Sequence, residues 1–168
     1  MSDRGFTLIE TMIALCLLAI VAAGVLPLGL IAMNSTENQG HLLARTVEYA
    51  QDKLEQLMAL SYGDTTSDTR VFPATDVGGS GLTIGGSADP NAPVALYVDY
   101  LDPDGTLLPS VGIAEPAGWY YKRVWSVTSP QANLKQITVT ASVKTAAASG
   151  MGGRIPRATV SVLKTSPF

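Results

Sequence analysis

Cysteine and histidine are almost absent from this sequence of 168 residues, which contains one of each. The cysteine, Cys16, has no second cysteine with which to form a disulfide inside the chain. The histidine, His41, offers almost no material for a Cys/His zinc site or for a catalytic Ser/His or Cys/His pair. We therefore expect no metal site, no cofactor and no catalytic residue, and a fold that is stabilised by packing alone.

Charged residues are also missing from residues 11–36, and residues 12–33 form an uninterrupted apolar run. At about 1.5 Å per residue, a helix of that length can cross a hydrocarbon core of about 30 Å. We therefore expect a membrane-spanning helix. The alternative is a secretory signal peptide, since residues 22–24 resemble a weak cleavage site, but its apolar region usually ends after about 7–15 residues.

Glu10 stands at the beginning of this apolar run, where a charge is unexpected. A carboxylate built into a membrane segment costs about 2.5–3.5 kcal/mol at mid-bilayer, so it requires a partner. The neighbouring residues supply no positively charged partner, since Phe6-Thr7-Leu8-Ile9 precede Glu10 and uncharged residues follow it. The nearest basic residue, Arg4, is followed directly by Gly5.

Residues 4–10, Arg-Gly-Phe-Thr-Leu-Ile-Glu, resemble the class III signal peptide of type IV prepilins and type II secretion pseudopilins. The resemblance implies that a prepilin peptidase cuts after Gly5 and methylates the new amine of Phe6, while Arg4 keeps the leader cytoplasmic. It also implies that Glu10 meets the Phe6 amine of a neighbouring subunit in a filament. Desolvation cancels much of that attraction, so the pair would set register more than stability. The alternative is an ordinary single-span anchor with an incidental Glu10.

Glycine and proline cluster in the C-terminal third of the apolar run, at Gly24, Pro27 and Gly29. Proline removes a backbone donor and each glycine costs a helix interior about 1 kcal/mol, so the helix should kink or loosen there. The resemblance to pilins implies that this stretch unwinds inside filaments. The alternative is a proline that a membrane helix simply tolerates.

A helical repeat of apolar residues continues beyond residue 33, although the composition becomes polar. We expect one helix from residue 6 to about residue 62, capped by Gly63 and packed on a sheet. The buried stripe should consist of Leu43, Val47, Ala50, Leu54 and Leu57, and the solvated face of Glu48, Asp52, Lys53 and Glu55. Residues 44–60 resemble the corresponding helix of PilV-type minor pilins and I-type minor pseudopilins.

Strand and turn patterns fill the remainder of the sequence. Residues 94–101 predict a strand, and Asp-Pro-Asp-Gly at 102–105 predicts a tight turn into residues 106–108. We expect a weak strand at residues 82–84 and three longer ones at residues 119–127, 134–144 and 157–164, in a mostly antiparallel sheet.

Two side-chain groups in these strands have alternative interpretations. Asp102 and Asp104 could serve as calcium ligands, but a calcium loop needs further oxygen ligands and a closing glutamate that are missing. Tyr121, Arg123 and Trp125 share one strand face, which favours core packing over a ligand platform.

Acidic residues are absent from the last part of the sequence. Residues 118–168 contain seven basic and no acidic residues, whereas residues 37–115 contain twelve acidic and three basic ones. One interpretation is that the two parts pair across the folded sheet. The other is docking between subunits, with acidic loops of one copy facing basic residues of the next, namely Lys135, Lys144, Arg154 and Arg157. A DNA-binding stripe would need interleaved aromatic residues, which occur only at residues 119–125.

The sequence thus predicts an α+β chain with a leader at residues 1–5, a transmembrane and filament-core helix at 6–33, an amphipathic helix at 34–62 and a β-rich globular part at 63–168. By resemblance it is a minor pilin or pseudopilin of a type IV pilus or type II secretion system, and not an enzyme. It would sit in the inner membrane with a periplasmic globular part, and later in a pilus or pseudopilus or at the cell surface.

The expected partners are the prepilin peptidase, other pilin or pseudopilin subunits and the inner membrane. Nucleic acid is not expected, since the net charge is -3 and the pI is about 5.0. Three alternatives stay open: a single-span anchored periplasmic binding or enzymatic domain, a DNA-uptake pseudopilin, and a conventionally secreted protein that begins beyond Gly24.

Overall fold

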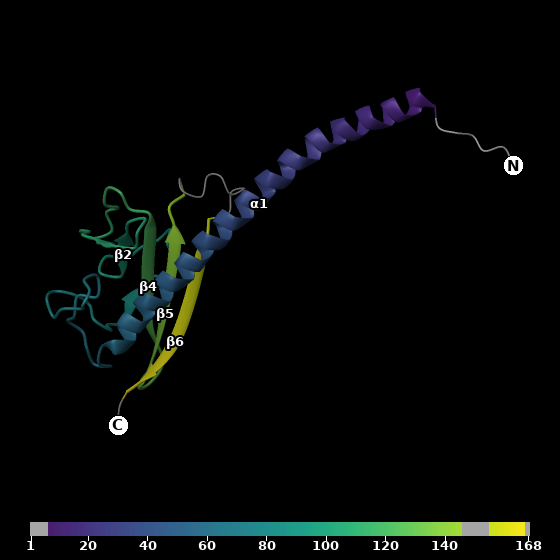
Figure 1. Ribbon diagram of the computed structural model, residues 1–168. Coiled ribbons are helices and arrows are strands. Elements are labelled where there is room, and N and C mark those ends of the chain that lie inside the picture. The colour runs from purple at the N-terminus through teal and green to yellow at the C-terminus, as the bar shows by residue number, and fades with distance from the viewer. Residues whose placement is uncertain (1–6, 146–154, 167–168) are drawn as a thin grey trace. The chain divides into compact units, whose positions relative to one another are not determined.

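The structure is a computed structural model that describes residues 7–145 and 155–166 (Figure 1). The chain divides into two compact units, Met1–Asn38 and Gln39–Phe168. We call the second unit the head. One helix, α1 (Leu8–Ala59), contributes to both units, and all the strands belong to the head.

The first unit contains the apolar part of α1. Residues Leu8–Leu30 have a mean hydropathy of 2.6 over 23 residues, long and apolar enough to cross a membrane, and the chain buries none of this segment. A helix surface as apolar as this one requires lipid or other helices around it. Pro27 lies inside α1, which continues past it.

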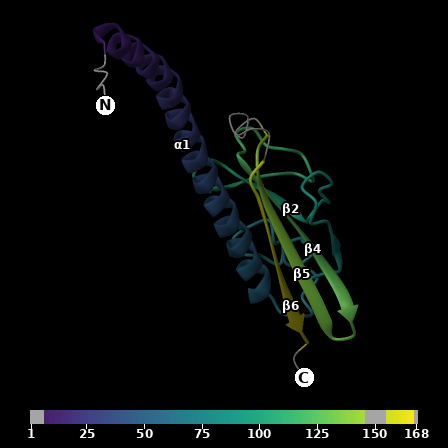
Figure 2. The same ribbon diagram turned by 90° about the vertical axis from the view of Figure 1, so that its right-hand side faces the viewer.

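The head contains one antiparallel sheet. Its strands are β1 (Gly85–Gly86), β2 (Val98–Leu101), β3 (Leu107–Leu108), β4 (Tyr121–Gln131), β5 (Leu134–Val143) and β6 (Arg157–Thr165). They lie in the order β3-β2-β4-β5-β6, with β1 paired to β4. The C-terminal part of α1 runs along one face of this sheet (Figure 2). The expected α+β, type IV pilin-like fold is confirmed.

The main core lies between α1 and the sheet. Ala50 and Leu57 of the helix pack with Trp125 of β4 and with the inward side chains of β5, including Ile137 and Val139. These five side chains are fully buried. A smaller cluster on the opposite face of the sheet joins Val98, Tyr100 and Val124 to Leu108 and Trp119.

The buried stripe of the helix differs from the predicted one. Leu43 and Val47 are 47% and 37% exposed, whereas Leu42, Thr46 and Lys53 are buried. The helix is therefore rotated by about one residue from the orientation that apolar periodicity predicts. The physical reason is a set of contacts made by Lys53, because the sheet offers its ammonium group a carboxylate acceptor, Asp99, and the aromatic ring of Trp125.

The helix also ends differently from the prediction. It ends at Ala59, and Gly63 does not adopt the left-handed conformation expected of a cap. Instead, Lys164 of β6 donates from Nζ to the carbonyl oxygens of Met58, at 2.7 Å, and Leu60. A lysine ammonium can satisfy helix-end carbonyls as well as a glycine cap can.

The hairpin between β2 and β3 has the predicted turn. Gly105 has φ 88°, and the Asp102 carboxylate accepts hydrogen bonds from the amides of Asp104 and Thr106, at 2.9 and 2.8 Å. A Cβ on Gly105 would lie 2.5 Å from the Tyr49 hydroxyl, so the turn packs closely against α1.

The weak strand expected at residues 82–84 is displaced. Leu82 is instead a fully buried core side chain, and the strand β1 follows at Gly85–Gly86, paired with Val127 and Ser126. Glycine is needed at 86, where φ is 80° and a Cβ would lie 2.3 Å from the Trp125 carbonyl oxygen.

Candidate functional site

The processing and assembly residues predicted at the N-terminus are only partly covered by the structure. Arg4, Gly5 and Phe6 lie outside the described residues. Glu10 lies in the first turn of α1, where the helix dipole favours a negative charge by about 0.3–1 kcal/mol. Its side chain is exposed, and no cation pairs with it among residues 7–145 and 155–166.

Gly24, Pro27 and Gly29 are all exposed residues of α1. A Cβ added to either glycine would meet nothing within 4 Å, so neither glycine is required for packing inside the chain. Their small size matters only if another molecule approaches this side of the helix, or if the helix bends there.

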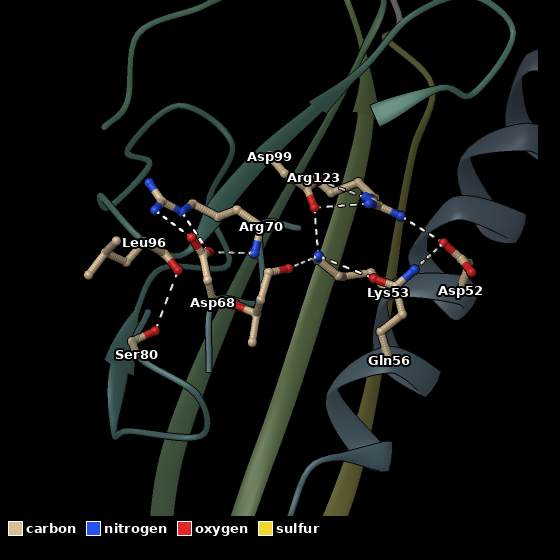
Figure 3. Close-up of polar contacts among 10 residues, drawn as sticks. Asp52, Lys53, Gln56, Asp68, Arg70, Ser80, Leu96, Asp99 and Arg123 are labelled. Carbon is tan, nitrogen blue, oxygen red and sulfur yellow. Dashed lines mark hydrogen bonds and ion pairs between the residues drawn. The ribbon is translucent and has the colours of Figure 1, made fainter. Parts of the chain in front are cut away.

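A second candidate site is a cluster of charged side chains between α1 and the sheet (Figure 3). Asp99 of β2 accepts from Lys53 of α1 at 2.6 Å and from Nε of Arg123 on β4 at 2.7 Å. Arg123 also donates from Nη2 to Asp99 and from Nη1 to Asp52, both at 2.9 Å. The side chains of Lys53 and Asp99 are 1% exposed and that of Asp52 is 53% exposed. We call these four residues the buried charge cluster.

Neighbouring groups complete the coordination of Lys53. Its ammonium also donates to the Thr69 carbonyl oxygen and, at 3.3 Å, to the side chain of Gln56. It lies 4.5 Å from the centre of the Trp125 ring, a cation–π contact. The Lys53 ammonium thus has three hydrogen-bond acceptors and an aromatic ring around it, in a side chain that is 1% exposed.

Burial and pairing shift the acidities in opposite directions. Burial lowers the pKa of Lys53 to about 8, against the attraction of Asp99, which raises it. Burial also acts to raise the pKa of Asp99, but Arg123 and Lys53 outweigh it and hold that pKa below its usual range. With two charges of each sign, the cluster is neutral overall at neutral pH.

The cluster joins three elements that are distant in the sequence, α1, β2 and β4. The prediction that Lys53 lies on a solvated face is wrong, whereas the predicted inward orientation of Arg123 with Tyr121 and Trp125 is confirmed. An arginine between two inward aromatic side chains was the available signal, because a buried guanidinium requires a carboxylate partner.

The basic residues of the last third have several kinds of partner. Arg123 and Lys122 pair with acidic residues from earlier in the chain, Lys122 with Glu115 at 2.6 Å. Lys135 is buried and donates to the carbonyl oxygens of Tyr62 and Leu82, both at 2.7 Å. Among the described residues of this segment, the pairing with acidic residues from earlier in the chain is therefore confirmed for Arg123 and Lys122.

The pKa of Lys53 predicts a rise in stability at alkaline pH. Between pH 8 and its ordinary value of 10.5, the folded chain has lost a proton that the unfolded chain still binds, so stability increases with pH. The slope should reach at most about 1.4 kcal/mol per pH unit. Urea unfolding of the chain in non-ionic detergent, followed by tryptophan fluorescence between pH 7.5 and 10, would measure it. Lys53→Met should remove most of this rise, and an unchanged slope in that variant would contradict the assignment.

Comparison with known proteins adds one finding. The family model described as the prokaryotic N-terminal methylation motif matches residues 1–26. No curated protein and no solved structure matches the chain. The matched residues comprise the positions predicted for cleavage, methylation and assembly, together with most of the apolar part of α1. The N-terminus is therefore of the type IV pilin-like class, which favours a structural subunit over an enzyme.

Proposed function

We propose that this chain is a minor pilin or pseudopilin, a subunit that is processed at its N-terminus and then assembled into a filament through α1. One observation carries the proposal: the methylation motif at residues 1–26 coincides with an apolar helix, Leu8–Leu30, that the chain leaves wholly unburied. In a filament subunit, one such helix serves two successive roles: it is first a membrane anchor and then a surface on which other helices pack.

The proposed domain arrangement is a leader at residues 1–5, a filament-core helix at 6–33, an amphipathic helix at 34–62 and a β-rich part at 63–168. Cleavage after Gly5 would leave the amine of Phe6 about one helical turn before Glu10. Since Glu10 has no cation among the described residues, a Phe6 amine from a neighbouring subunit is the proposed partner.

The proposed partners are a prepilin peptidase and other pilin or pseudopilin subunits, and the proposed location is the inner membrane with the head in the periplasm, before assembly. Among pilin-like proteins, the resemblance of residues 44–60 favours the PilV-type minor pilins and I-type minor pseudopilins. We propose Gly24, Pro27 and Gly29 as the stretch that loosens when the helix enters a filament.

Processing is the first test of this function. Mass spectrometry of the mature chain should find a methylated Phe6 at the N-terminus, and Gly5→Leu should block cleavage, because the scissile backbone must fit closely where glycine meets least steric resistance. Ser2→Leu, also in the leader but away from the cut, should be processed normally. A mature chain that keeps Met1, or that begins after Gly24, would refute the proposal.

A further inference from the structure

The head contains a groove of about 740 Å³ that lies apart from the buried charge cluster. It lies on the sheet face opposite α1, where β4 begins, β5 ends and β6 begins. Apolar residues form part of its wall, among them Pro90, Trp119 and Ile155. Three cationic side chains also line it: Lys122, Lys144 and Arg157.

The strand register explains why these cations converge. Lys122 is opposite Ser142, and Ser142 is opposite Arg157, so the three residues form one row across β4, β5 and β6. Lys144 follows at the end of β5. The Lys122 and Lys144 ammonium groups lie 5.1 and 4.9 Å from the centre of the Trp119 ring.

The cations differ in whether a carboxylate already neutralises them. Lys122 is paired with Glu115 at 2.6 Å. Lys144 and Arg157 have no carboxylate partner among residues 7–145 and 155–166. The groove thus presents two unneutralised positive charges beside an apolar wall, which suits an anionic partner.

The Trp119 ring indicates which kind of anion fits. Two ammonium groups already lie over it, so a nucleic-acid base or a sugar ring cannot stack there without displacing a lysine. Carboxylates, which need only the positive charges, can bind without that displacement. The chain itself carries exposed carboxylates with no cationic partner in the described part, for example Glu55 and Asp104.

We propose that the groove lined by Lys144 and Arg157 docks an exposed carboxylate of a second copy of this chain, such as Glu55 or Asp104, as a contact between heads of neighbouring subunits. The proposal rests on the proposed function, because it requires copies to stand side by side. It also revises the predicted set of docking residues, since Lys135 is buried on backbone carbonyls and Arg154 lies outside the described residues.

Zero-length cross-linking tests the contact directly. Full-length chains labelled with ¹⁴N and ¹⁵N would be mixed in vesicles of a zwitterionic lipid and treated with a carbodiimide, which joins a lysine only to a touching carboxylate. We expect Lys144 of one isotope linked to an aspartate or glutamate of the other. Arg157→Glu should abolish this link while leaving the Lys144 amine in place as the reporter. Arg45→Glu changes an exposed cation outside the groove and should preserve it.

Several outcomes would overturn the proposal. One is a Lys144 cross-link in which both linked peptides always carry the same isotope, as expected for a link inside one chain. Another is a cross-link between chains whose yield is unchanged by Arg157→Glu. Protection of Lys144 by an oligonucleotide, or by vesicles of an anionic lipid, would assign the groove to those ligands instead. Circular dichroism of each variant would verify that the sheet is intact.

The N-terminal mass of the same samples separates this inference from the proposed function. A chain that begins at a methylated Phe6 but shows no interchain link refutes the groove contact alone. An uncut Met1 refutes the proposed function, whatever the cross-links show.

Discussion

Asp99→Asn should destabilise the head by about 3–5 kcal/mol, because it leaves the charges of Lys53 and Arg123 buried without their shared carboxylate. Asp52→Asn is the matched control, since Asp52 also binds Arg123 but is 53% exposed, and it should cost only about 0–1 kcal/mol. Urea unfolding of the full chain in non-ionic detergent would measure both. Tryptophan fluorescence reports the head alone in this experiment, because both tryptophans, Trp119 and Trp125, belong to it.

Equal effects of the two substitutions would contradict this account of the cluster. They would mean that Lys53 and Arg123 find other acceptors, or reach water, once the Asp99 charge is gone. A double substitution, Lys53→Met with Asp99→Asn, provides a further control. It removes one of the two stranded cations together with the carboxylate, so it should cost less than the sum of the single changes.

Glu10→Leu should separate membrane stability from assembly. The substitution removes a charge that is costly in lipid, so the cleaved chain should accumulate in the membrane at least as well as the parent. Without a carboxylate for the proposed contact with a neighbour's Phe6 amine, it should enter filaments poorly. Glu10→Asp keeps the charge but shortens its reach, so its incorporation should be intermediate. Isolation of assembled fibres, with membrane levels measured alongside, would decide between these outcomes.

Incorporation of Glu10→Leu at the level of the parent would show that the ion pair is dispensable. That result is the one expected of a subunit at a filament tip, which has no neighbour beyond it. Processing at Gly5 should be normal in both Glu10 variants, and this serves as the control for correct membrane insertion.

Local patterns predicted the elements of the head well. The Asp-Pro-Asp-Gly turn and the alternation of residues in β5 depend on neighbouring residues, and both are present as expected. The position of Lys53 could not be predicted in this way. Its partner Asp99 lies on a different element, and only the fold brings the two together. A lysine in a polar helix gives no local sign that it will be buried.

The end of α1 shows the same limit. Gly63 has the local chemistry of a cap, but Lys164, 106 residues beyond Met58, satisfies the carbonyl oxygens there. At the N-terminus, by contrast, the sequence is more informative than the structure. The motif at residues 4–10 predicts cleavage, methylation and assembly, but of its two charged residues, Arg4 and Glu10, only Glu10 lies in the described part of the chain.

The contact of Lys164 with the end of α1 has a consequence for the order of events during synthesis. Lys164 belongs to β6, so the Met58 carbonyl oxygen in the last turn of the helix lacks its lysine partner until nearly the whole chain has left the ribosome. The apolar segment Leu8–Leu30 emerges first and can enter the membrane long before that. A chain interrupted ahead of β6 would therefore carry the complete apolar segment but lack the lysine that binds the carbonyl oxygens at the helix end.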